Sequence, residues 1–171
     1  MLRAGALAAL VLLSGAAAEP GAAWQEIAWP FPRDAWPAGR AFRCQECGLE
    51  VYVRPKLGFC NCTSGVTGDA EVDAVSDVDM LSAEFSAPAD GEPVRIGGLA
   101  GRARTYVVKT PAGTVLATGY ALSSKCDLLV AVSRGRAAAE RTAVVGLLES
   151  ESIAPWIAAK LGLGRARIAS R

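Results

Sequence analysis

Apolar and polar residues alternate along the middle of the chain, and this pattern predicts a β-sheet. The alternation is clearest over residues 102–108 and 114–122, and the Pro-Ala-Gly at residues 111–113 is typical of a turn between two strands. Residues 127–132 form the most apolar stretch beyond the N-terminus, which suits a central strand. We therefore expect a sheet built mainly from residues 94–133.

A second hairpin is predicted nearer the N-terminus. Residues 50–54 alternate like a strand, and Pro55 is expected to end it because proline cannot donate to a β-ladder. Residues 58–62 then have the pattern of a return strand. The predicted hairpin carries a cysteine pair at each end, Cys44 with Cys47 and Cys60 with Cys62.

Three segments have apolar residues at helical spacing. Residues 70–81 carry a valine or leucine at every third position, and residues 137–148 are rich in alanine. Residues 153–161 carry Pro155 in their first turn, where proline is tolerated. Consecutive hairpins followed by a helical C-terminus indicate the α+β fold class, an antiparallel β-sheet with a C-terminal helix packed on one face.

The segment ahead of the predicted hairpin is an arm rich in tryptophan and proline, which spans residues 19–41. Proline at this density opposes helix and regular strand pairing and favours an extended course. Its three indoles must be buried somewhere. The arm either wraps its own domain and covers a sheet edge, or docks on a partner, since tryptophan is enriched in binding hot spots. The indoles belong to Trp24, Trp29 and Trp36.

The first 18 residues have the pattern of a cleavable export signal. Arg3 is the only charged residue before Glu19, and residues 4–13 form an apolar run that is shorter than the roughly 20 residues needed to span a bilayer. Small residues at positions 16–18 follow, as a signal peptidase requires. We expect cleavage near Ala18 and a periplasmic or secreted protein whose mature chain has no membrane span.

Length and charge limit the domain organisation and the partner. Removal of residues 1–18 leaves one domain's worth of chain, and we expect a single α+β domain over residues 42–164 with a basic tail at residues 165–171. The full chain carries 18 basic and 17 acidic residues, and loss of Arg3 makes the mature chain neutral, which argues against nucleic acid as a partner. The charges are uneven, because residues 63–92 contain eight acidic residues and no basic one.

The chain contains no histidine. This excludes Ser-His-Asp and Cys-His catalytic sites and metal sites with histidine ligands. The Cys-x-x-Cys motif is followed by Gly48 rather than histidine, so it is not a covalent haem attachment site. No pair of carboxylates stands out as a hydrolase centre, and we predict no catalytic residue.

Five cysteines remain as candidate chemistry. In an oxidising compartment disulfides are expected, and the predicted hairpin would bring Cys44 and Cys47 within reach of Cys60 and Cys62. The sequence cannot choose among the possible connectivities. Cys126 is either a buried inert thiol or the partner of one of the N-terminal cysteines.

Residues 44–48, Cys-Gln-Glu-Cys-Gly, resemble the knuckle of zinc ribbons over these five positions. In such a knuckle two sulfurs of a tight turn bind one metal, and the following glycine relieves the backbone. The resemblance implies a four-thiolate zinc or copper site with Cys60 and Cys62, although their spacing departs from that of a second knuckle. A redox-active dithiol is a third interpretation, which Glu46 between the thiols disfavours.

Our leading hypothesis is an exported, non-catalytic periplasmic protein that binds a protein partner, as an accessory or assembly factor of an envelope complex, and that needs no cofactor. The candidate contact residues are the three tryptophans of the arm together with Arg102 and Arg104, which share one strand face. The alternative is a thiol-based activity, either metal binding or dithiol redox, at the cysteines of residues 44–62.

Overall fold

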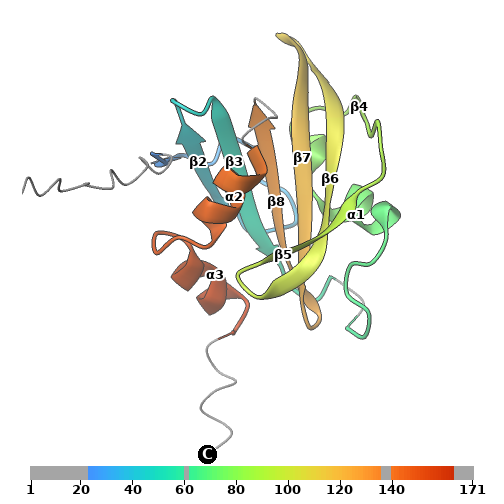
Figure 1. Ribbon diagram of the computed structural model, residues 1–171, viewed down its shortest axis with the longest axis vertical. Coiled ribbons are helices and arrows are strands. Elements are labelled where there is room, and N and C mark those ends of the chain that lie inside the picture. The colour runs from blue at the N-terminus through green and yellow to red at the C-terminus, as the bar shows by residue number, and fades with distance from the viewer. Residues whose placement is uncertain (1–22, 60–61, 136–139, 164–171) are drawn as a thin grey trace, which may run out of the picture.

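The computed structural model describes residues 23–59, 62–135 and 140–163. Across these ranges eight strands form one antiparallel sheet in the order β1-β2-β3-β8-β7-β6-β4, with β5 paired to β6 (Figure 1). The predicted export signal at residues 1–18 and the basic tail at residues 165–171 lie outside the described residues. The strands are β1 (Gln25–Ile27), β2 (Arg40–Cys44), β3 (Leu49–Lys56), β4 (Phe85–Ser86), β5 (Glu92–Ile96), β6 (Leu99–Thr110), β7 (Gly113–Ser124) and β8 (Asp127–Gly135).

The centre of the sheet follows the sequence pattern. β6 and β7 form the predicted long hairpin, which closes where Thr110 pairs with Gly113. β8 lies between β3 and β7, as expected of a central strand. Its alternate residues Leu129 and Ala131 face one core, whereas Leu128 and Val130 face another. Burial on both faces explains why residues 128–132 of this strand are all apolar.

Helices cover both faces of the sheet. α2 (Glu140–Leu148) and α3 (Ala154–Lys160) lie over β2, β3 and β8 on one face, where their apolar residues pack on the sheet (Figure 1). The other face holds α1 (Asp69–Val75) and the 3-10 turn η1 (Val78–Met80), which pack on β6, β7 and β8. The predicted α+β fold with a C-terminal helix on one face is confirmed.

The helix predicted over residues 70–81 is shorter than expected. α1 ends at Val75, and Asp77 adopts a left-handed backbone with φ of 63° before η1 begins. The side chain of Asp77 points into the molecule and forms ion pairs with Arg54 and Lys56. A continuous helix would not direct the Asp77 side chain in the same way. The predicted helix at residues 153–161 is present, with a proline in its first turn.

The cysteine-bearing hairpin is present, but its second strand differs from the prediction. β3 pairs with β2 on one side and with β8 on the other, and no strand forms at residues 57–59. Pro55 does not end β3, which continues to Lys56. The pairing of β2 with β3 ends at Val53. Pro55 therefore lies beyond β2, where the edge of β3 that faces β2 has no partner to which a backbone N–H would need to donate.

The arm wraps its own domain. β1 pairs antiparallel with the outer edge of β2. The chain then crosses the face opposite α2 and α3, where Trp29 and Phe31 pack edge-on against Tyr52 with ring centroids 6.3 and 4.7 Å away. Gly39 lies so close to β3 that a Cβ atom there would be 2.1 Å from the carbonyl oxygen of Val53. This geometry agrees with the interpretation in which the arm covers a sheet edge.

Candidate functional site

The cysteines form two disulfides among the described residues, Cys44–Cys47 and Cys62–Cys126. The predicted cross-pairing of Cys44 and Cys47 with the later pair is therefore wrong, and the alternative in which Cys126 bonds to an N-terminal cysteine is confirmed. Cys60 lies outside the described residues.

The cysteines do not cross-pair because the two disulfides lie at opposite ends of β3. This strand runs antiparallel to β8 from Leu49, opposite Gly135, to Lys56, opposite Leu128. Cys47 lies just before one end, whereas Cys126 lies near the other end. Seven residue steps of about 3.3 Å separate these ends by roughly 23 Å, so their sulfurs cannot meet.

The same separation removes the four-thiolate metal site, because Cys62 is far from Cys44 and Cys47. Within the described residues, no group of three or more cysteine, aspartate or glutamate side chains is placed to hold a metal ion. The turn itself keeps features expected of a knuckle, since Gly48 has a φ of 63° and the Cys47 N–H donates to Cys44 Sγ at 3.1 Å. A disulfide closes this turn.

Arg102 and Arg104, the predicted partner contacts on β6, are paired with acidic residues of α1. Arg102 Nη2 donates to Asp69 Oδ1 at 2.6 Å, and Arg104 Nη1 donates to Asp73 Oδ2 at 2.7 Å. The Gly91 N–H and the Arg102 guanidinium together lower the pKa of Asp69. Part of the acidic segment seen in the sequence therefore neutralises the sheet beneath it.

A buried charged cluster lies beneath the arm. Arg54 and Lys56 on β3 are only 2% and 5% exposed. Arg54 Nε donates to Asp77 Oδ2 at 2.6 Å, and Lys56 Nζ lies 2.5 Å from Asp77 Oδ1. Burial alone would lower the pKa of Arg54, but its hydrogen bonds to Asp77 and Asp34 outweigh burial and raise it. The guanidinium therefore stays charged inside the fold.

Trp36 of the arm covers this cluster together with Phe59. The two rings meet edge-on at 5.2 Å, and Lys56 Nζ lies 5.8 Å from the Trp36 ring and 5.5 Å from the Phe59 ring. A cleft of about 380 Å³ opens beside them. The two cations that line it, Arg54 and Lys56, are already paired with Asp34 and Asp77. The contacts around this cleft therefore mainly hold the arm against the sheet.

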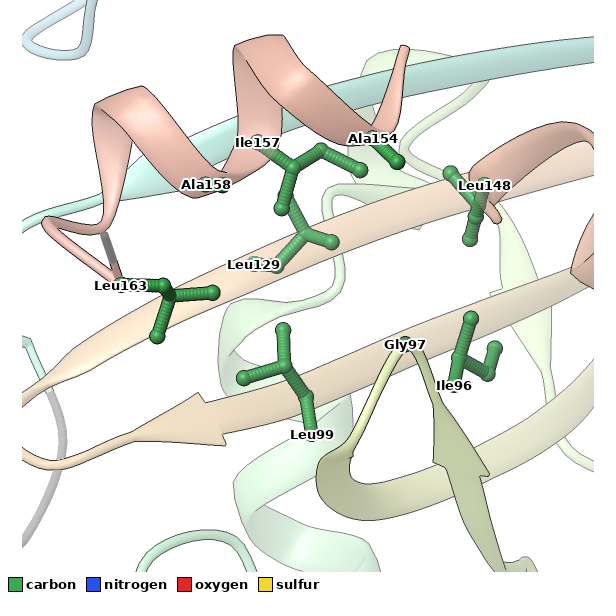
Figure 2. Close-up of a pocket in the computed structure, with 9 residues that line it drawn as sticks. All are labelled: Ile96, Gly97, Leu99, Leu129, Leu148, Ala154, Ile157, Ala158 and Leu163. Carbon is green, nitrogen blue, oxygen red and sulfur yellow. The ribbon is translucent and has the colours of Figure 1, made fainter. Parts of the chain in front are cut away.

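An apolar groove of about 280 Å³ lies between α3 and the turn that joins β5 to β6 (Figure 2). Every described residue that lines it is a glycine or has a hydrocarbon side chain. Two of them, Leu129 and Ile157, form its centre in Figure 2, and Leu163 stands at its rim, 38% exposed. The lining residues are Ile96, Gly97, Leu99, Leu129, Leu148, Ala154, Ile157, Ala158 and Leu163.

Local backbone geometry keeps this groove open. Gly162 has a φ of 64°, and the following Leu163 N–H donates to the Ala158 carbonyl at 2.9 Å, which ends α3 and turns Leu163 to the rim. On the opposite rim, the Gly97 N–H donates to the Glu149 carboxylate at 2.8 Å and joins the β5–β6 turn to the end of α2. Sequence reasoning missed this site, because its residues have the pattern of ordinary core positions.

No protein-family model matches the chain, and no curated protein matches it in sequence. Among the described residues, no helix is long and apolar enough to cross a membrane. Disulfides form in oxidising compartments, so the two observed here are compatible with an extracellular or periplasmic protein.

Proposed function

We propose that this chain is an exported, non-catalytic protein that binds a protein partner in the cell envelope, where it acts as an accessory or assembly factor. The partner inserts an apolar anchor side chain into the groove between α3 and the β5–β6 turn. The export pattern of residues 1–18, the two disulfides and the absence of histidine from the sequence support this function.

The hydrocarbon side chains that line the groove are the observation that carries the proposal. None of these side chains offers a hydrogen bond, so an occupant gains free energy mainly by burying hydrocarbon, at about 25 cal/mol per Å². The volume of about 280 Å³ lies below the roughly 300–1,000 Å³ of typical small-molecule sites. A single leucine, methionine or phenylalanine anchor from a partner surface fits these limits better than a cofactor does.

In this proposal the groove, rather than the arm, contacts the partner protein. Trp24 packs against the core beneath α2 and α3, Trp29 packs against Tyr52, and Trp36 packs against Phe59, so all three indoles are engaged within the chain. Arg102 and Arg104 are engaged by α1. Partner binding by these residues stays a prediction, and the exposed apolar rim at Leu163 is the better candidate contact.

The test is photo-crosslinking in the native envelope with a benzophenone amino acid in place of Leu163. We expect one discrete adduct with another protein. Ala158 lines the groove and the neighbouring Ala159 is exposed, so Ala158→Trp should fill the groove and abolish the adduct, whereas Ala159→Trp should retain it. If Ala158→Trp lowers the melting temperature of the protein, the smaller substitution Ala158→Leu is used in its place. An adduct that survives filling of the groove, or that contains only this chain, would contradict the proposed function.

A further inference from the structure

The Cys44–Cys47 turn is held by main-chain contacts that do not need its disulfide. β2 and β3 pair in register from Arg40 opposite Val53 to Cys44 opposite Leu49. Within the turn the Gly48 N–H donates to the Gln45 carbonyl at 3.2 Å, and Gly48 supplies the left-handed backbone that the turn requires. The hairpin is therefore built to keep its shape when the S–S bond opens.

The two sulfurs of this turn differ in access. Cys44 is fully buried, whereas Cys47 is partly exposed. Thiol–disulfide exchange begins with attack of a thiolate on one sulfur, and the rate depends on access to it and on the stability of the leaving thiolate. The Cys47 N–H already donates to Cys44 Sγ at 3.1 Å, and a hydrogen bond of this kind favours the charged form of the sulfur. The geometry therefore makes Cys47 the attacked sulfur and Cys44 the leaving group.

The second disulfide has the opposite character. Cys62 and Cys126 are 64 residues apart, so their bond joins the segment after β3 to the turn between β7 and β8. Opening it releases a long loop, which couples this bond to folding. The Cys44–Cys47 bond spans three residues within one hairpin. Cys44–Cys47 is thus a local disulfide, and Cys62–Cys126, which crosses the fold, serves as a reference for it within the same chain.

The charge of Glu46 opposes thiolate formation less than its position in the sequence suggests. Its side chain is exposed, so solvent and salt screen its charge. Nearby, Glu50 is paired with Arg43 and Arg134 at 2.8 and 2.5 Å, which neutralises the carboxylate next to the turn.

We propose that Cys44–Cys47 is a thiol–disulfide exchange site that oxidises dithiols of other exported proteins. A substrate thiolate attacks Cys47 Sγ, the S–S bond breaks, and its electron pair goes to Cys44 Sγ. The second substrate thiol then displaces Cys47 from the mixed disulfide. The substrate leaves as a disulfide, and its two protons end on Cys44 and Cys47, so the exchange is stoichiometric and needs no other oxidant. This activity is independent of the apolar groove.

The first test is equilibration of the purified full chain with buffers of reduced and oxidised dithiothreitol, followed by alkylation and peptide mass spectrometry. We expect Cys44–Cys47 to open at a ratio of reduced to oxidised reagent at least about tenfold lower than Cys62–Cys126 requires, with the circular dichroism spectrum unchanged. Opening of both bonds together, or only in denaturant, would show that Cys44–Cys47 is purely structural.

The second test separates the two sulfurs with Cys44→Ser and Cys47→Ser, each in a Cys60→Ser background. The Cys47 thiol left in the first variant should react with 5,5′-dithiobis(2-nitrobenzoate) at least about tenfold faster than the Cys44 thiol left in the second. Equal or reversed rates would overturn the assignment. The amount of a reduced dithiol peptide that is oxidised should be proportional to the amount of wild-type chain added. The double variant Cys44→Ser, Cys47→Ser should not oxidise the peptide.

Discussion

Asp34 on the arm and Arg54 on β3 form a two-bonded ion pair, in which Arg54 Nη1 and Nη2 donate to the two carboxylate oxygens at 2.9 and 2.7 Å. The same guanidinium donates to Asp77 through Nε and Nη2. Arg54 therefore joins three parts of the chain, namely the arm, the sheet and the segment between α1 and η1. Trp29 lies over its guanidinium, with the ring centre 5.8 Å away.

The two carboxylates that share Arg54 should differ in their effect on stability. Asp77 is 6% exposed and also pairs with Lys56, so Asp77→Asn leaves two buried cations short of negative charge and should lower the free energy of unfolding by about 3 kcal/mol or more. Asp34 is 40% exposed, so Asp34→Asn should lower it by about 1 kcal/mol or less. Asparagine is chosen because it tolerates the left-handed backbone of Asp77. Urea unfolding measures both.

The control for this comparison is Asp79→Asn, which changes an exposed aspartate beside the same cleft. A surface change of this kind should stay within about 0.5 kcal/mol of the wild type. Equal losses for Asp34→Asn and Asp77→Asn would mean that the burial of the carboxylate does not set its contribution to stability.

Acid should destabilise the fold through Asp69. The pKa of this carboxyl is held below its ordinary value of 3.8 by the Gly91 N–H and then by the Arg102 guanidinium. The unfolded chain therefore binds the proton more readily than the folded chain does. The stability contributed by Asp69 is fully present above pH 3.8 and is lost as the pH falls through the lower folded pKa. Urea midpoints measured down to about pH 2 should fall less steeply for Asp69→Asn than for the wild type.

Arg102→Gln serves as the intermediate case. It removes the guanidinium but leaves the Gly91 N–H on Asp69, so its pH profile should lie between those of the wild type and Asp69→Asn. If the profile of Asp69→Asn runs parallel to that of the wild type, Asp69 makes no pH-dependent contribution.

The parts of the fold that the sequence predicts correctly are local. The β6–β7 hairpin follows from alternation on both sides of a turn signal, and the position of Pro155 marks the start of α3. The predicted return strand at residues 58–62 is wrong because β8, far away in the sequence, pairs with one edge of β3. β2 pairs with the other edge, and the sequence pattern divides its residues 40–44 between the arm and the domain. α1 ends early because Arg54, far away in the sequence, pairs with Asp77.

Part of the sequence signal for the charged pairs is the spacing of their residues. Asp69, Asp73 and Asp77 recur every four residues, which places acidic groups along one side of a helix. Arg102 and Arg104, like Arg54 and Lys56, are two residues apart and share a strand face. Matching these periods is consistent with the pairing of Arg102 and Arg104 with Asp69 and Asp73, whereas Asp77 pairs from beyond the end of α1. The apolar groove has no comparable signal, because it is a gap among residues that all have a core pattern.

The two disulfides should contribute differently to stability. In the chain-entropy model, closing the long loop between Cys62 and Cys126 contributes about 4 kcal/mol, whereas the short loop between Cys44 and Cys47 contributes about 2 kcal/mol. Replacing both cysteines of each pair with serine and measuring unfolding in urea tests the difference. A larger loss for the Cys44–Cys47 pair would show that its bond, rather than the β2–β3 register, holds that end of the sheet.

Deletion of residues 19–37 should abolish cooperative unfolding of a chain that also lacks residues 1–18. The deletion removes β1 from the edge of β2, removes Trp29 and Phe31 from the face of Tyr52, and leaves Arg54 without Asp34. It therefore exposes an apolar face and a strand edge at the same time, and both favour aggregation. Thermal melts followed by circular dichroism, with light scattering to detect aggregates, measure the result. A matched substitution, Trp29→Ala, keeps the arm and β1, and should lower the melting temperature while unfolding stays cooperative. A truncated chain that melts in one sharp transition near the wild-type temperature would show that the arm is not needed by its own domain, and would free its tryptophans for a partner.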